Sequence, residues 1–88
     1  MQVLLLTTPM RIVGEIPHPD CRITLLSWNN RYLIKLEQGF LEQTFKINQF
    51  DLIQESDLNK LLDEKFLAES LARFQEMARS LQAAMDRI

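Results

Sequence analysis

Hydrophobic and polar residues alternate along the first half of the chain in a way that is typical of antiparallel strands. Four short alternating segments, each followed by residues that favour turns, predict a β-meander over residues 11–47. The predicted strands are Arg11–Pro17, Cys21–Trp28, Arg31–Glu37 and Phe40–Ile47. The turns that connect them are expected at Pro17–Asp20, Asn29-Asn30 and Gln38-Gly39.

The two hairpin turns fix the register of the predicted sheet. A two-residue turn at Asn29-Asn30 pairs Trp28 with Arg31. From there it pairs Arg22 with Glu37, Ile23 with Leu36, Leu25 with Ile34, Leu26 with Leu33, and Ser27 with Tyr32. A turn at Gln38-Gly39 pairs Leu36 with Leu41, Tyr32 with Phe45, and Lys35 with Glu42. Both hairpins then share one apolar face, made of Ile23, Leu25, Tyr32, Ile34, Leu36, Leu41 and Phe45.

After Asn48 the pattern changes from a period of two to helical spacing. Ser56 is a suitable N-cap for a short helix through Leu58, Leu61 and Leu62. Asp63 is a suitable N-cap for a second helix, Glu64–Ile88, which contains no Gly or Pro. The sequence therefore predicts an α+β fold: an antiparallel β-meander of about four strands packed against a long C-terminal amphipathic helix that a short helix precedes, with the helical part over 56–88.

The long helix carries a continuous apolar stripe. Its positions recur at spacings of four and three: Leu67, Leu71, Phe74, Ala78, Leu81, Met85 and Ile88. A helix from Glu64 to Ile88 is roughly 37 Å long, whereas a strand of eight residues covers only about 26 Å. We therefore expect Leu81, Met85 and Ile88 to extend beyond the sheet. Burying them between two chains would contribute on the order of 5–8 kcal/mol before association costs, which predicts a homodimer. Alternatively, the helix end frays or packs on Val3–Leu6.

A second apolar patch is predicted on the opposite face of the sheet. The register places Leu26, Leu33 and Trp28 there, with Val13 beside them. Tryptophan in a surface patch is typical of an interface. The alternative is that Met1–Pro9 or the connection from Asn48 to Ser56 covers this patch.

Length and composition limit the remaining possibilities. At 88 residues the chain is one domain, 1–88, in which 1–9 is either an extra strand or a mobile tail. The hydrophobic fraction of 47% is too high for disorder, and a net charge of −2 argues against nucleic acid as a partner. The only cysteine excludes an internal disulfide. The apolar run Val3–Leu6 is too short for a signal peptide or a membrane span, so we expect a cytoplasmic protein with no membrane contact.

Candidate chemistry is sparse. His18 and Cys21 are too few for a zinc site and have no evident third partner for nucleophilic catalysis. The only glycines are Gly14 and Gly39, so no phosphate-binding loop is present, and Gly14 within a strand suggests a bulge or close packing. Gln43 is a polar residue on the apolar face. We expect its side chain either to reach the edge of the sheet or to hydrogen-bond to a partner. We expect no catalytic residue, no metal ligand and no cofactor, hence no enzyme.

Three segments of the chain are similar to a known family. They are Ile16–Pro19, Ser27–Gly39 and Leu41–Ile47. With them, the region from about Arg11 to Met85 resembles a family of small uncharacterised bacterial proteins of Bacteroidetes type. The resemblance implies a bacterial, cytoplasmic origin, and it carries over no activity, cofactor or functional residue.

The sequence thus predicts a non-enzymatic interaction or structural protein. The expected function is self-association through the C-terminal helix, with an unidentified protein partner as a further possibility. The candidate interaction residues are Leu81, Met85, Ile88, Leu26, Trp28 and Leu33. The alternative is a small-ligand-binding module that uses the Trp28 face of the sheet or a pocket between helix and sheet.

Overall fold

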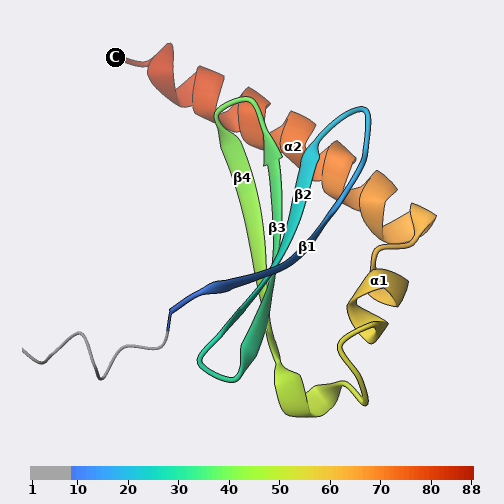
Figure 1. Cartoon of the computed structure of the whole chain (residues 1–88). Helices are drawn as coiled ribbons and strands as arrows, with labels where there is room; N and C mark the ends of the chain where they lie inside the picture. The colour runs from blue at the N-terminus through green and yellow to red at the C-terminus, as the bar shows by residue number, and fades with distance from the viewer. Residues whose placement is uncertain (1–8) are drawn as a thin grey trace, which may run out of the picture.

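The computed structural model describes residues 9–88, and in this part the chain forms one four-stranded antiparallel sheet with helices on one face (Figure 1). The elements in chain order are β1 (Arg11–Ile16), β2 (Arg22–Trp28), β3 (Arg31–Gln38), β4 (Leu41–Asn48), the 3₁₀ turn η2 (Gln49–Asp51), α1 (Asp57–Leu61) and α2 (Glu64–Met85). The predicted α+β fold is confirmed. The prediction for Met1–Pro9 falls mainly on residues 1–8, which lie outside the described residues.

The sheet is a meander in which each strand pairs with its neighbour in the chain, in the order β1-β2-β3-β4. Asn29 and Asn30 both have positive φ, 51° and 61°, as a type I′ turn requires. The β2–β3 register therefore runs from Trp28 opposite Arg31 to Arg22 opposite Glu37, with Leu25 opposite Ile34 between them. The register predicted for this hairpin is confirmed at every position.

The register predicted for the next hairpin is wrong by two residues. The turn is Gly39-Phe40, because Gly39 supplies the positive φ (59°) that the first position of a type II′ turn needs. Leu36 consequently pairs with Gln43 rather than Leu41, Ile34 rather than Tyr32 pairs with Phe45, and Thr44 rather than Glu42 lies opposite Lys35. A shift of two residues preserves the alternation of a strand, so the apolar face is the predicted one.

Strand β1 contains a β-bulge, because the pairing with β2 shifts between Ile12 and Gly14. This confirms the bulge suggested for Gly14, and no close packing occurs there, since an added Cβ would meet no atom within 4 Å. The bulge turns Val13 toward the helix side, where it packs against the core. The prediction that Val13 lies beside Trp28 on the opposite face is therefore wrong, and Ile12 occupies that position instead, opposite Leu26.

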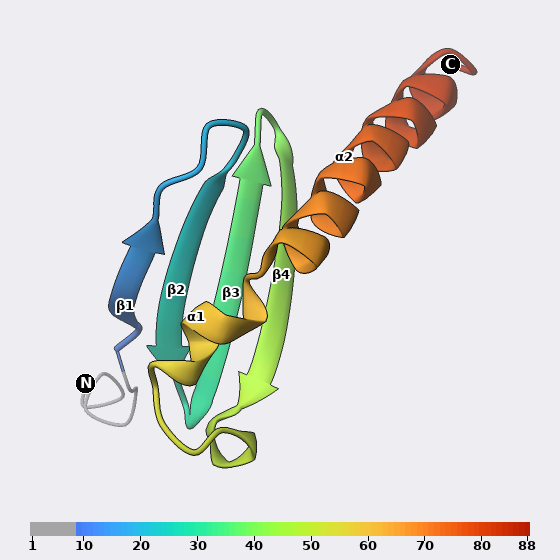
Figure 2. The ribbon, with the colours of Figure 1, turned by 90° about the vertical axis from the view of Figure 1, so that its right-hand side faces the viewer.

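The core lies between the sheet and the two helices. Ile23, Leu25, Ile34 and Leu36 point from the central strands toward Leu58, Leu62 and Phe74, and all seven are buried. The rings of Phe45 and Phe66 meet edge to face with centroids 5.2 Å apart, which joins β4 to the first turn of α2. In Figure 2, α2 crosses β4 obliquely and continues past the edge of the sheet. The edge strand β4 therefore carries the main contact with α2.

The two predicted helix N-caps behave differently. Asp63 caps α2, since its carboxylate accepts a hydrogen bond of 2.8 Å from the backbone N–H of Phe66. Ser56 precedes α1 but has helical φ and ψ, and its side chain makes no capping hydrogen bond. The prediction that Ser56 caps α1 is therefore wrong. The Asp57 carboxylate instead accepts hydrogen bonds from the N–H groups of Ile53 and Gln54.

The polar residue on the apolar face, Gln43, is 8% exposed, and both polar atoms of its amide have a hydrogen-bond partner within the chain. Its Nε2 donates to the backbone carbonyl of Ser70 at 2.8 Å, and its Oε1 accepts from Arg73 Nη1, also at 2.8 Å. Gln43 therefore fixes the position of α2 over β4, and it needs no external partner.

Candidate functional site

The C-terminal part of α2 carries large apolar side chains that the rest of the chain does not cover. α2 ends at Met85, three residues before the predicted end, and its C-terminal half lies beyond the sheet (Figure 2). Leu81 is 50% exposed, Met85 55% and Ile88 fully exposed. These residues continue the stripe that includes the buried Phe74. The same apolar face of the helix is therefore buried against the core at Phe74 and exposed to solvent toward the C-terminus.

An apolar groove runs between this part of α2 and the β3–β4 turn. Its volume is about 400 Å³, and Phe40 and Leu41 face Ala78, Leu81 and Met85 across it. Phe40 is fully exposed although its ring is one of the largest apolar groups in the chain. Sequence analysis missed Phe40, because it was assigned to the strand. The preference of a type II′ turn for Gly followed by any residue is the signal that could have identified it.

The polar side chains that line the groove, Gln38 and Gln82, are uncharged. The Gln82 amide donates a hydrogen bond of 2.8 Å to the carboxylate of Asp86, one turn further along the chain. The charged residues Glu76 and Arg79 lie on the solvent side of α2, joined by a contact of 2.6 Å. The hydrogen bond from Arg79 lowers the pKa of the Glu76 carboxyl. An apolar centre with a neutral border has the composition of a protein–protein interface core.

The patch predicted on the opposite face is smaller than expected. Leu33 is only 6% exposed, packed between its strand neighbours, and Leu26 and Trp28 are half-buried. Ile12 beside Leu26 is 65% exposed. The structure brings Leu26, Trp28 and Leu33 together as predicted, but it leaves Ile12 as the side chain of this patch that a partner could reach most fully.

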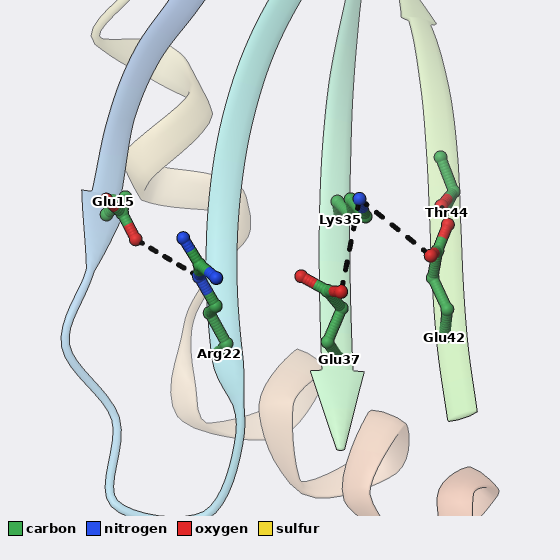
Figure 3. Close-up of polar contacts among 6 residues, drawn as sticks. All are labelled: Glu15, Arg22, Lys35, Glu37, Glu42 and Thr44. Carbon is green, nitrogen blue, oxygen red and sulfur yellow. Dashed lines mark hydrogen bonds and ion pairs between the residues drawn. The ribbon is translucent and has the colours of Figure 1, made fainter. Parts of the chain in front are cut away.

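The rest of the opposite face is covered by charges of both signs (Figure 3). Glu15 pairs with Arg22 across β1 and β2 at 3.4 Å. Lys35 lies 4.0 Å from Glu37 and 3.9 Å from Glu42, so it reaches the predicted partner Glu42 diagonally rather than directly across the strands. Thr44 donates a 2.7 Å hydrogen bond to Glu42. These side chains are a third or more exposed, so each pair contributes little to stability.

A shallow depression of about 600 Å³ lies at the β2–β3 turn. It is bordered by Arg11, Trp28, Asn29, Asn30 and Gln49, together with Pro9, Met10 and Ser27. The Arg11 guanidinium is held by Glu55 at 3.0 Å, and the same carboxylate oxygen accepts a 3.3 Å hydrogen bond from the Tyr32 hydroxyl. Burial raises the pKa of Tyr32, and the Glu55 charge raises it further. An aromatic ring surrounded by amides offers a polar ligand both a stacking surface and hydrogen-bonding groups.

His18 and Cys21 lie in the β1–β2 connection. The His18 Nδ1 accepts a hydrogen bond of 3.0 Å from the backbone N–H of Asp20, which stabilises the turn. Burial, and next the charge of Asp20, raise the pKa of the Cys21 thiol, the direction opposite to that of an activated nucleophile. Within residues 9–88, no three His, Cys, Asp or Glu side chains gather in a way that could hold a metal ion.

Comparison of the chain with protein-family models, with curated proteins and with solved structures gives no match. In the described part of the chain, no helix has the length and apolar character needed to cross a membrane.

Proposed function

We propose that this chain is a non-enzymatic interaction protein that forms a homodimer through the C-terminal half of α2. The observation that carries the proposal is the exposure of Leu81 and Met85 beside the fully exposed Phe40, with Ile88 also fully exposed after the end of the helix. Side chains of this size together expose on the order of 600 Å², close to the ~800 Å² that each partner contributes to a standard interface. Apolar exposure of this extent is at the upper end of what the largest patch on a monomeric protein shows, and such patches often mark an interaction site.

A second copy of the chain is the occupant that this surface fits best. The polar residues that line the groove are Gln38 and Gln82, and neither would oppose an identical surface by charge repulsion. The charged pair Glu76 and Arg79 lies away from the groove and stays in solvent. An isologous dimer buries the same surface on both copies, and a neutral, apolar patch can be buried in this way without opposing like charges.

The double variant Leu81→Glu/Met85→Glu tests the proposal. We expect the wild-type chain to sediment as a dimer at micromolar concentrations and the variant to sediment as a folded monomer with an unchanged circular dichroism spectrum. The matched control is Ala72→Glu/Ala83→Glu, which adds the same two charges on the opposite, exposed side of α2. A wild-type chain that remains monomeric at high concentration would contradict the proposal.

The depression beside Trp28 supports a second function, the binding of a small polar ligand. The observation that favours it is the presence of Arg11, Asn29 and Asn30 around one indole ring. Trp28 fluorescence, recorded against a panel of sugars and nucleosides, tests it, with Asn29→Gly as the comparison, because glycine keeps the positive φ of the turn and removes only the amide. A saturable shift that Asn29→Gly abolishes is the expected result, and an unchanged spectrum across the panel counts against this function.

A further inference from the structure

Strand β4 is an edge strand whose backbone is regular along its whole length. Among residues 9–88 no strand pairs with its far side, and it contains neither Pro nor Gly over eight residues. The other edge, β1, has six residues, a bulge and a proline directly after it. An edge strand such as β4 is a template for a further strand.

The hydrogen-bonding groups that β4 offers can be identified from its register with β3. Residues of an antiparallel strand alternate between those bonded to the neighbour and those whose N–H and C=O point away from it. The two-residue turn pairs Gln38 with Leu41, and at the other end Gln49 N–H donates to the Asn30 carbonyl at 3.0 Å. Odd-numbered positions therefore bond to β3, and the groups of Glu42, Thr44 and Lys46 point outward.

The side chains at these outward-bonding positions are self-complementary. If two copies of β4 pair antiparallel with a two-fold axis at Thr44, each Glu42 lies opposite the partner's Lys46, and the two Thr44 side chains are neighbours. Both arrangements are favourable cross-strand pairs. On the helix side, the same register places Leu41 opposite Ile47 of the partner subunit. Lys46 is exposed and has no ion-pair partner within the described chain, so it is available for this contact.

Other registers of the same pairing are less favourable. Moving the axis from Thr44 to Glu42 would place two glutamates opposite each other, and moving it to Lys46 would do the same with two lysines. Like charges directly opposite each other are destabilising. Axes at Gln43 or Phe45 lose both Glu–Lys pairs. The charges along β4 therefore select a single register.

We infer that two chains join at β4 into one continuous eight-stranded sheet, with Glu42 of each chain opposite the partner's Lys46. This inference rests on the proposed self-association and specifies its geometry. The part of α2 that extends past the β4 edge would then lie over the partner's β4, near the partner's Ile47 (Figure 2). Leu81 and Met85 would thus gain the same kind of strand surface that Phe74 covers within its own chain.

A charge exchange between two variants tests this geometry. Lys46→Glu places two glutamates at each contact, and Glu42→Lys places two lysines there, so we expect each variant alone to dimerise about tenfold or more weakly than wild type. Mixed together, the two variants should form a heterodimer with an affinity within about threefold of the wild type. Arg22→Glu on β2 changes the net charge by the same amount and in the same direction as Lys46→Glu, so it is the control and should dimerise like the wild type.

A spin label at position 44 gives an independent measurement. In the Cys21→Ser/Thr44→Cys chain, labels across the two-fold axis should be in direct dipolar contact, because paired Cα atoms lie about 5.5 Å apart. Two results would overturn the strand geometry and leave the proposed function intact. One is unchanged dimerisation of Lys46→Glu. The other is a dimer whose labels are well separated and which the Leu81→Glu/Met85→Glu substitutions abolish. A monomeric wild-type chain would overturn both.

Discussion

Gln43 on β4 and Arg73 on α2 are joined by a hydrogen bond of 2.8 Å between the amide Oε1 and the guanidinium Nη1. The Gln43 amide also donates to the carbonyl of Ser70, so one buried side chain fixes the helix at two adjacent turns. A polar group on an otherwise apolar face is stable only when its hydrogen-bonding capacity is used. Within residues 9–88, no buried side-chain nitrogen or oxygen lacks a partner.

Replacement of Gln43 by Ala should lower the free energy of unfolding by about 1–3 kcal/mol, because Ser70 and Arg73 lose their partner in a buried setting. Chemical denaturation followed by circular dichroism measures the change. Gln75→Ala on the exposed side of α2 is the control and should stay within ~0.5 kcal/mol of the wild type. An equal effect of the two variants would show that the Gln43 contacts do not stabilise the fold.

The two helix starts offer a matched pair of substitutions. Asp63→Ala removes a capping hydrogen bond of 2.8 Å and should lower stability by about 1 kcal/mol. Ser56→Ala removes a side chain that makes no capping contact and should leave the thermal midpoint nearly unchanged. Asp63→Asn keeps the acceptor and should recover most of the loss. The prediction fails if Ser56→Ala costs as much as Asp63→Ala.

Replacement by alanine should change the stability of the chain in opposite directions at the two glycines. Gly39 has a φ of 59°, a conformation that strains alanine, so Gly39→Ala should destabilise the chain by roughly 1 kcal/mol or more. Gly14 has no atom within 4 Å of an added Cβ and is not among the positive-φ residues, so Gly14→Ala should be neutral or stabilise by up to about 1 kcal/mol. Thermal unfolding of both variants and of the wild type measures these two changes in stability.

Asp57 should make stability depend on pH in the acid range. Hydrogen bonds from the Gln54 and Ile53 N–H groups, together with the nearby Lys60 ammonium, lower the pKa of its carboxyl in the folded state. The ionised form therefore stabilises the fold above the unfolded pKa of about 3.9, and this contribution is lost as the pH falls from there through the lower folded pKa.

The variant Asp57→Asn isolates this effect, because the amide oxygen can still accept the two hydrogen bonds but does not titrate. Unfolding curves recorded between neutral pH and pH 2 should converge for the wild type and the variant as the acid limit is approached. A constant difference between the two across the whole range would exclude Asp57 as the source of the pH dependence.

Local chemistry determined how well each turn and cap could be predicted. Asn29-Asn30 admits one two-residue turn, so the β2–β3 register followed directly. Gly39 can occupy either central position of such a turn, and alternation of apolar residues does not distinguish registers that differ by two residues. The apolar face was therefore predicted correctly, while the pairs across β3 and β4 were not. The Asp63 cap was predicted because it depends only on its own helix.

The remaining features depend on how the elements pack, and the sequence alone does not define this. The partners of Gln43 became evident only when α2 was placed over β4. The exposure of Phe40 followed from the position of the turn, and the burial of Leu33 followed from its place on a central strand. The prediction that Leu81, Met85 and Ile88 are exposed rested on the helix being longer than the strands, and this held although the helix ends at Met85 instead of Ile88.

The bulge at Val13 bears on how this sheet avoids uncontrolled growth. A sheet that accepts new strands at both margins can elongate into a fibre, since every added chain offers a fresh template. Between Ile12 and Gly14 the spacing of backbone donors and acceptors is interrupted, and the strand ends at Ile16 just before a proline. If strands add at β4 as inferred above, this interruption of β1 confines the addition to one margin, and the assembly ends after two chains have met.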